Sequence, residues 1–308
     1  MTALPLPSRR HENWRHLEPE LVPAYAGPDW ERPQEAHTPL TEPWEEGTWI
    51  AWQNGVPKRL PDGAAEATPP ERDLPFPAGA EALWRWHREH ACWLKYRARD
   101  GECVVLTHQR TGGLAACGVC VEVPARAKVS IVDQHEGAQG LGLSALVVQV
   151  GEGAEAEMLR VQQEAQGASL SRIALVLERG AKVRAMLAEL GGGMARVDLA
   201  ALLADESAIH TGSLVPARGT ARVQHALDVR HEGRKSTSRW TARAVACDRA
   251  RAILHGRATI ASGADDAEAH QHAAGILRSE GAEIDARPDL VIEHDQVQAS
   301  HGCAVGWL

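Results

Sequence analysis

The chain has 308 residues, a formal net charge of −8 and a sequence pI near 6.0, and it is long enough to bury a sizeable core. The acidic balance excludes a general nucleic-acid binder, which needs a surplus of Lys and Arg to neutralise phosphates. No apolar run approaches twenty residues and the start lacks an apolar signal-peptide core, so we expect a cytoplasmic protein with no membrane span.

The first hundred residues differ in composition from the rest, which predicts a separate N-terminal region over residues 1–100. Fourteen of the 17 prolines lie at or before Pro77, and eight of the 10 tryptophans lie at or before Trp93. Within this region, apolar residues at helical spacing predict a helix over 81–99, which Asp100-Gly101 ends.

Three tryptophans of the N-terminal region, Trp44, Trp49 and Trp52, could stack on bases or sugars. Phe and Tyr are rare in this chain, so the same rings are more simply explained as the core of the region.

Strand-sized apolar runs separated by glycine fill residues 101–308. Glycine recurs at near-even intervals, at positions 137, 153, 167, 180 and 193. That spacing fits one strand plus one corner, with two strands in each coil of a solenoid. We therefore predict a mainly β protein with a parallel β-helix core over 101–308. The alternative is a β-sandwich or jelly roll, but its hairpins need Asn-Gly or Asp-Gly turns, and Asp100-Gly101 is the only one from residue 100 onward.

The segment from His225 to Leu308 carries the most specific pattern in the chain, and it ends in Ser-His-Gly-Cys-Ala-Val-Gly. Its residues resemble the SufB/SufD family of SUF iron–sulfur cluster assembly scaffolds, and within it the SufD branch. The positions that agree with the family are Ser238, Asp248, Ala250, Arg251, Gly256, Ala264, Asp266, Ala267, Gln271, Leu277, Ser279, Ala282, Pro288, Leu290, Ile292, Asp295, Val297, Ser300, His301, Gly302, Val305 and Gly306.

Two other stretches of the sequence are similar to the same family. The opening Leu6–His16 matches the family's start, and the middle of the chain shares its landmarks at Gln162, Glu164, Gly192, Gly193, Arg196, Asp198, Leu199, Leu202 and Gly212. The resemblance implies a right-handed parallel β-helix. It also implies a non-catalytic scaffold subunit that works beside a SufB-like paralogue and a SufC-like ABC ATPase, and that helps iron enter and a transient, shared iron–sulfur cluster form.

His301 is the residue that the resemblance assigns to iron, because the His of this family segment lies where the SufD branch meets SufB. A neutral imidazole binds iron without first losing a proton. Cys303 departs from the family, which has Ala or Thr there, while Ala299 stands where the family usually has Cys. Residues two apart on a strand share a face, so His301 and Cys303 could offer two ligands side by side. The alternative for His301 is a structural histidine at a strand end, and the alternative for Cys303 is a small buried side chain in the core.

Cys117 and Cys120 form a CxxC that could serve zinc or redox chemistry. A structural zinc site needs two more ligands, and no second CxxC exists. A thioredoxin-like role needs a βαβ context, which is missing. We therefore interpret both as core thiols, together with Cys92, Cys103 and Cys247.

His270 and His272, with Asp265 and Asp266, form the densest polar cluster, with a spacing that suits a metal on a strand. Its alternative is a solvated corner. No phosphate loop of the GxxxxGK[ST] type occurs, so we expect no bound nucleotide and place ATPase activity in the partner.

The family continues after this segment into a helical tail that docks the SufC ATPase. Here the chain stops at Leu308, and the tail is absent from this sequence. We therefore expect docking of a SufC-like subunit to be lost or to use another surface. Two other functions compete with the scaffold. One is a β-helix carbohydrate-active enzyme, which would need an Asp/Arg or Asp/Asp groove on one face of the coils. The other is a degenerate, non-functional SufD relative.

Overall fold

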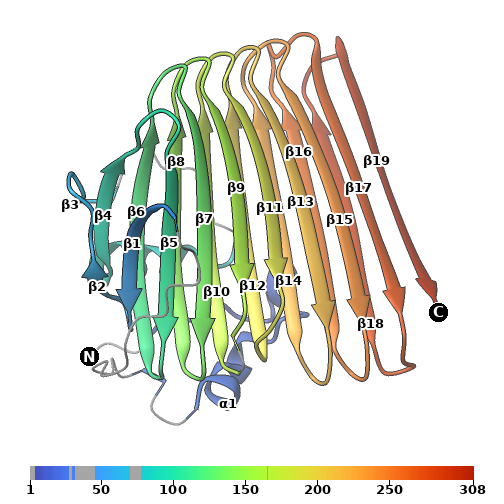
Figure 1. Cartoon of the computed structure of the whole chain (residues 1–308). Coiled ribbons are helices and arrows are strands. Elements are labelled where there is room, and N and C mark those ends of the chain that lie inside the picture. Colours follow the sequence, from blue (N-terminus) through green and yellow to red (C-terminus); the bar gives the residue numbers. More distant parts are fainter. Residues whose placement is uncertain (1–3, 28–29, 32–45, 70–77, 165) are drawn as a thin grey trace.

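The computed structural model describes residues 4–27, 30–31, 46–69, 78–164 and 166–308. Its main body is a solenoid of two facing β-sheets, and the chain alternates between them at each corner (Figure 1). The predicted parallel β-helix with a small helical N-terminal region is therefore confirmed. Strand pairs are parallel in both sheets except β1–β2 and β3–β4, which rules out the hairpin-built sandwich for the part of the chain described.

Sheet A has ten strands, and all but β2 are odd-numbered. They are β1 (Thr48–Gln53), β2 (Val56–Arg59), β5 (Cys103–Arg110), β7 (Lys128–Gly137), β9 (Glu155–Gln162), β11 (Lys182–Glu189), β13 (Ala208–Ala217), β15 (Thr237–Ala246), β17 (Ala267–Leu277) and β19 (Val297–Trp307).

Sheet B has nine strands, and all but β3 are even-numbered. They are β3 (Ala65–Glu66), β4 (Cys92–Arg97), β6 (Leu114–Val123), β8 (Leu141–Val150), β10 (Ala168–Leu177), β12 (Met194–Leu203), β14 (Arg222–His231), β16 (Arg251–Ile260) and β18 (Glu283–Ile292).

The extent of a coil follows from the register between neighbouring strands of one sheet. A residue and its register partner on the next strand of the same sheet are one coil apart. Lys182 pairs with Ala208 in this way, and Arg251 pairs with Glu283 in a later coil. Each coil contains two strands and two corners, as the glycine spacing predicts. Each strand repeats an alternation of inward and outward side chains, so stacking builds one continuous apolar interior.

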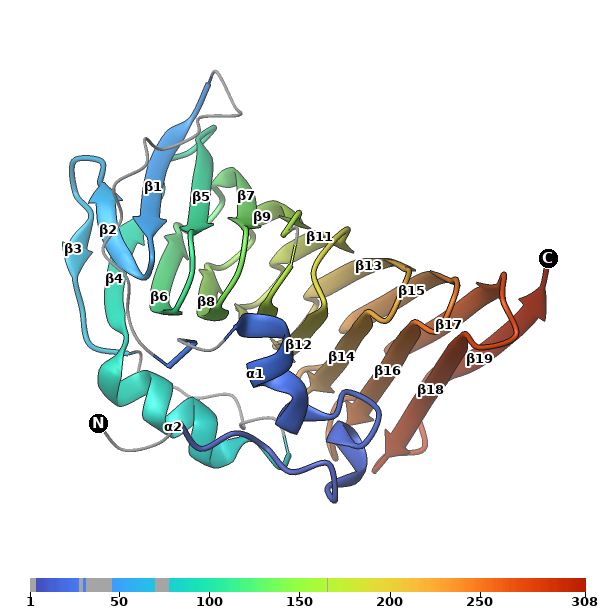
Figure 2. The same ribbon diagram turned by 90° about the horizontal axis from the view of Figure 1, so that it is seen from below.

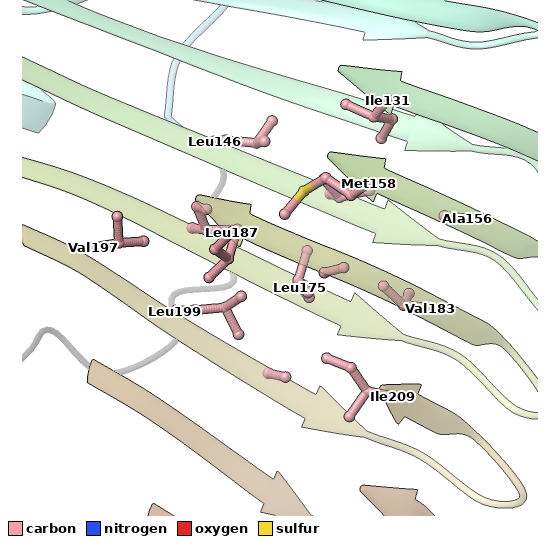
Figure 3. Close-up of a cluster of buried hydrophobic side chains, with 14 of the residues drawn as sticks. Ile131, Leu146, Ala156, Met158, Leu175, Val183, Leu187, Val197, Leu199 and Ile209 are labelled. Carbon is pink, nitrogen blue, oxygen red and sulfur yellow. The ribbon is translucent and has the colours of Figure 1, made fainter. Parts of the chain in front are cut away.

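The interior is packed with aliphatic side chains contributed by both sheets. Figure 3 shows Leu146, Met158, Leu175, Leu187 and Leu199 directed into the space between the sheets. Leu175 is 1% exposed, and burying a leucine fully contributes roughly 2 kcal/mol. Because the side chains interlock between coils, no coil buries its apolar face by itself.

The corner that leads from sheet B into sheet A repeats one left-handed residue in successive coils. These residues have φ between 55° and 65° and are Arg126, Gly153, Gly180, Glu206, Lys235 and Asp266, the last at 59°. Their main-chain N–H groups donate to the corner of the next coil, as from Gly180 to the carbonyl of Asp205 at 2.8 Å. The corners therefore form a hydrogen-bonded ladder along one side of the solenoid.

The N-terminal region contains two short 3-10 helices (Glu12–Trp14 and Pro19–Leu21), α1 (Val22–Ala26) and α2 (Glu81–His90). Figure 2 shows α1 and α2 on the side of the solenoid that sheet B forms. Trp14, Leu83 and Trp84 pack there against the outer apolar face of β8, β10 and β12. Because both faces of β10 are covered, all ten of its residues are buried.

The region before residue 100 is not separate from the solenoid. β1 pairs in parallel with β5, and β4 pairs with β6, so both sheets extend into it. The helix expected over 81–99 ends at His90, and Cys92–Arg97 is a strand. The physical reason is that Trp93 and Leu94, which continue the apolar pattern, are also suited to a half-buried strand and gain a neighbouring sheet there. Trp49 and Trp52 are buried, but not in a core of the N-terminal region: Trp52 belongs to the interior of the solenoid, and Trp49 packs with Val105 and Val132 of sheet A. Trp44 lies outside the described residues.

Candidate functional site

His301 lies on β19, the last strand of sheet A, and is exposed. Its register partner is Gln271, and the partner of Gln271 one coil earlier is Trp240. Trp240 and Gln271 are buried inside the solenoid, and register partners in parallel strands point the same way. The imidazole of His301 is therefore directed toward the inner side of the coil, at the end of the described solenoid.

A hydrogen bond to the opposite sheet fixes the ring of His301. Its Nδ1 lies 2.8 Å from the main-chain oxygen of Pro288 on β18, and since a carbonyl only accepts, Nδ1 is the donor. One coil earlier, Gln271 Nε2 donates in the same way to the oxygen of Asp289, also at 2.8 Å. In the neutral ring the other nitrogen, Nε2, then carries a lone pair and is the atom able to bind a metal.

Cys303 shares the face of His301, two positions further along β19, and is also exposed. Its register partner, Ala273, is buried in the core. The thiol is thus not a buried apolar group in this structure. Within the described ranges His301 and Cys303 have no third His, Cys, Asp or Glu close enough to complete a metal site, so further ligands would come from elsewhere.

The histidines of the DAEAHQH stretch point away from His301. They pair in register with Ser300 and Gly302 on the outer face of β19. His270 Nδ1 lies 2.7 Å from Ser300 Oγ, and His272 Nδ1 lies 3.1 Å from Arg243 Nη1. Asp265 contacts His294 and Arg234 at the corner. The structure therefore gives this cluster the geometry of a solvated corner and an outer face.

A second polar centre lies inside the first coils and was not predicted. Arg160 is fully buried and donates to Asp133 Oδ2 at 2.7 Å, to Glu189 Oε1 at 3.0 Å and to Ser171 Oγ at 2.8 Å. Burial opposes ionisation of Asp133, but its interactions with His135, Arg160 and His108 outweigh it and hold its pKa well below the usual range. Removing one partner of such a network leaves a buried charge uncompensated.

Two histidines adjoin this network from neighbouring strands of sheet A. His108 and His135 stack at 4.1 Å between ring centroids, and the Nε2 of each lies close to Asp133 Oδ1, at 3.1 and 3.0 Å. Together with Asp133 they are the one group of three potential metal ligands among the residues that the structure describes. Arg160 Nη1, however, lies 2.6 Å from His135 Nε2 and already supplies the cation, so the geometry does not favour a metal there.

The charge states of the two rings differ. Burial, and then the guanidinium of Arg160, lower the pKa of His135 to about 3. Burial also lowers the pKa of His108, but its interactions with the adjacent sulfur of Cys117 and the carboxylate of Asp133 outweigh it and raise the value to about 9. His108 Nδ1 lies 3.2 Å from Cys117 Sγ. The centre therefore holds a neutral ring next to a protonated one.

The CxxC does not act as a unit in this fold. Cys117 belongs to the interior core, whereas Cys120 packs with Trp93 in a cluster on the outer face of sheet B. Residues three apart on a strand point to opposite faces, so the two thiols cannot bind one metal or form a disulfide without rebuilding the strand.

A sequence pattern could have revealed the buried centre, because its polar residues repeat at the coil period. His108 pairs in register with His135 one coil later, and Asp133 pairs in the same way with Arg160. Polar residues that recur once per coil indicate a column of polar side chains inside the solenoid. Glycines that recur twice per coil indicate its corners.

A pocket of about 270 Å³, lined by both acidic and basic side chains, lies on the outer face of sheet B. Asn13 of the N-terminal region contributes to its lining. Asp198 is bound by Arg196, and Asp289 lies 3.7 Å from Arg257 Nη2 and from Arg287 Nε. Arg196 also donates to the carbonyl of Asn13 and stacks on Trp14, 3.7 Å from the ring centroid. Through Arg196, Asp198 therefore serves the packing of the N-terminal region.

The described part of the chain contains no helix that is long and apolar enough to cross a bilayer. Comparison with known proteins finds a matching family model and a relative. The family model described as "SUF system FeS cluster assembly, SufBD core domain" matches residues 106–308. The iron–sulfur cluster assembly protein SufD of Bacillus subtilis (strain 168) is 33% identical over 96 residues, which are 31% of this chain and 22% of that protein.

The match to SufD thus spans only part of that relative's length. The family match covers about two thirds of the chain, including the whole solenoid from β7 to β19, and the family resemblance noted in the sequence is confirmed. The protein belongs to the SufBD family of the SUF iron–sulfur cluster assembly system.

Proposed function

We propose that this chain is a non-catalytic scaffold subunit of a SUF-type complex, in which nascent iron–sulfur clusters are built at an interface with a SufB-like partner. ATP hydrolysis would belong to a SufC-like subunit. Membership of the SufBD family and the partial match to SufD support this role. Iron and sulfide are cargo in this scheme, and the chain's contribution is to present donors to them.

The observation that carries the proposal is the geometry of His301. The ring is exposed on the last described strand of the solenoid, and Pro288 holds Nδ1, so Nε2 is the nitrogen that can bind a metal. One imidazole cannot hold a cluster, and the remaining ligands would be thiolates of the partner. Cys303, exposed on the same face, is the second donor that this chain can add.

The strands around His301 are suited to strand-to-strand docking. Among the described residues β19 pairs only with β17 and β18 only with β16, which leaves one side of each backbone available. Val291, Ile292, Val305 and Trp307 are exposed along these strands, and Trp307 is 63% exposed. An edge with unpaired backbone and apolar side chains favours addition of a partner's strands, which would bring the partner's ligands to His301.

The test is co-expression of this chain with SufB-like and SufC-like partners, followed by affinity purification and measurement of cluster yield per complex. His301→Ala is compared with His272→Ala, an exposed histidine on the outer face of the adjacent strand. We expect both variants to form the complex and only His301→Ala to lose most of the cluster yield. Failure of the wild-type chain to form a complex would overturn the scaffold role. An intact complex with full yield in His301→Ala would overturn the site alone.

A further inference from the structure

Cys117, His108 and Asp133 form a hydrogen-bonded chain across the interior of the first coils. His108 Nδ1 lies 3.2 Å from Cys117 Sγ, and His108 Nε2 lies 3.1 Å from Asp133 Oδ1. The thiol comes from β6 of sheet B, and the other two residues come from β5 and β7 of sheet A. A thiol, an imidazole and an orienting carboxylate in this order are the arrangement that activates a cysteine nucleophile.

The surroundings favour a protonated imidazole next to the sulfur of Cys117. With a pKa of about 9, His108 is protonated at neutral pH and donates from both nitrogens, to Cys117 Sγ and to Asp133. The indole of Trp52 stacks on the His108 ring at 4.7 Å with an interplanar angle of 3°. An aromatic face of this kind stabilises a cation.

A small cavity adjoins the thiol. It has a volume of about 20 Å³ and is lined by Cys117, His108, Trp52 and Ser144, among others. That is room for about one water-sized group. Trp52 is 1% exposed, and its Nε1–H has no hydrogen-bond acceptor among the described residues. An unpaired buried donor is unfavourable, and an oxygen atom brought into the cavity would offer it an acceptor.

Cys92 is the second thiol beside Cys117. It lies on β4, and its Cα is the direct register partner of the Cα of Cys117 on β6. Side chains of register partners point the same way, and neighbouring strands are about 4.8 Å apart, within the Cα–Cα range that a disulfide spans. Cys92 is partly exposed, whereas Cys117 is 4% exposed. The partner of Cys117 in this fold is thus Cys92, on the preceding strand of sheet B, and not Cys120.

We propose that Cys117 and Cys92 form a peroxide-sensitive dithiol, in which the Cys117 thiolate reacts with hydrogen peroxide or a small hydroperoxide and Cys92 then closes a disulfide. In the first step Sγ of Cys117 attacks one peroxide oxygen, the O–O bond breaks, and the electron pair leaves on the second oxygen. His108 gives that oxygen a proton. The sulfur is oxidised by two electrons to a sulfenic acid, and the peroxide is reduced to water or an alcohol.

In the second step the sulfur of Cys92 attacks the sulfenic sulfur of Cys117. The S–O bond breaks, the hydroxyl group leaves as water with the proton of the Cys92 thiol, and the S–S bond forms. Burial, together with the charges of Glu66 and Cys117, raises the pKa of Cys92. Cys92 therefore stays a thiol, whereas Cys117 lies 3.2 Å from the His108 imidazole and reacts first, which sets the order of the two steps.

The experiment treats the full chain with hydrogen peroxide, stops the reaction with catalase and maps cysteines by peptide mass spectrometry under denaturing conditions with a sulfenic-acid trap. We expect the wild type to lose the mass of two hydrogens through a Cys92–Cys117 link. Cys92→Ser should instead give the trapped sulfenic acid at Cys117. Cys120→Ser is the matched control and should form the same link as the wild type.

His108→Gln tests the activation and should slow oxidation of Cys117 by about tenfold or more. If that variant does not fold, the wild type still decides the matter through a comparison with Cys303, which is exposed and is not hydrogen-bonded to an imidazole in the described part of the chain. Oxidation of Cys303 while Cys117 stays reduced, a link between Cys117 and Cys120, or unchanged kinetics in folded His108→Gln would each overturn the proposal.

Discussion

His301 on the last strand of sheet A donates its Nδ1–H to the main-chain oxygen of Pro288, 2.8 Å away on the last strand of sheet B. The bond ties the two sheets together at the end of the solenoid and determines which nitrogen of the ring is available. His301 can thus use Nδ1 for the hydrogen bond that holds the ring and Nε2 to bind a metal.

The first prediction concerns this tautomer. In the isolated chain, neutral His301 should carry its proton on Nδ1, because the carbonyl of Pro288 can only accept. Long-range ¹H–¹⁵N correlation spectra of ¹⁵N-histidine-labelled protein, with His301 assigned through His301→Gln, measure this directly. A proton on Nε2 in the neutral ring would contradict the geometry.

The second prediction concerns the interior. Leu175→Ala should lower the free energy of unfolding by about 3 kcal/mol, because Leu175 is 1% exposed and its loss leaves a cavity between stacked coils. Leu214→Ala removes the same atoms from a side chain that is 42% exposed and should cost less than about 1 kcal/mol. Urea unfolding followed by circular dichroism compares the two, and equal costs would contradict the assigned core.

The third prediction concerns the corners. Gly180 has φ of 65°, a conformation that costs a residue with a Cβ roughly 1–2 kcal/mol. Gly180→Ala should therefore destabilise the protein by about that amount, although the nearest atom to the new methyl group lies 3.9 Å away. Gly306→Ala, at a glycine with ordinary φ and open space, should be neutral in the same thermal-unfolding assay.

The fourth prediction concerns acid. Burial lowers the pKa of four histidines, to about 4 for His87 and His231 and about 3 for His135 and His225. The unfolded chain binds protons at these groups near pH 6.5, whereas the folded chain does so only near their lowered values. Their contribution to stability is thus present above pH 6.5 and is lost as pH falls from there toward 4, at on the order of 1 kcal/mol per pH unit for each histidine.

His231→Gln isolates one of these groups. The variant should lose stability at neutral pH, because the ring contacts Ser236 Oγ and Ser238 Oγ at 2.8 Å, but its stability should fall less steeply between pH 6.5 and 4. Urea unfolding at several pH values measures both effects. An unchanged pH slope would show that His231 is not a buried neutral ring.

Part of this structure could be predicted because residues that mark the corners recur at a regular spacing in the sequence. Gly153, Gly167 and Gly180 mark corners at half the coil length, and all three have positive φ. The left-handed position of Gly153 and Gly180 is occupied by Glu206 and Lys235 in later coils, where no glycine marks it, so the period was visible only over the first coils. The helix over 81–99 was extended too far because the sequence does not show that β6, a distant neighbour, pairs with Cys92–Arg97.

The geometry of the candidate site was predictable in the same partial way. The shared face of His301 and Cys303 follows from strand alternation, but the bond to Pro288 depends on how the two sheets face each other. The CxxC drew attention to Cys117 and Cys120, whereas the contacts of Cys117 are with His108 across the interior and with Cys92 on the next strand. Contacts between coils depend on register, and short-range spacing does not reveal them.

A nitrogen of His301 should bind iron in the assembled complex, and this can be measured directly. The complex is prepared with ¹⁵N-histidine in this chain only, loaded with a cluster, reduced to a paramagnetic state and measured by pulsed electron paramagnetic resonance. We expect a ¹⁵N coupling to the cluster that His301→Ala removes and His272→Ala keeps. A cluster with no histidine coupling in the wild type, or a coupling that persists in His301→Ala, would contradict it.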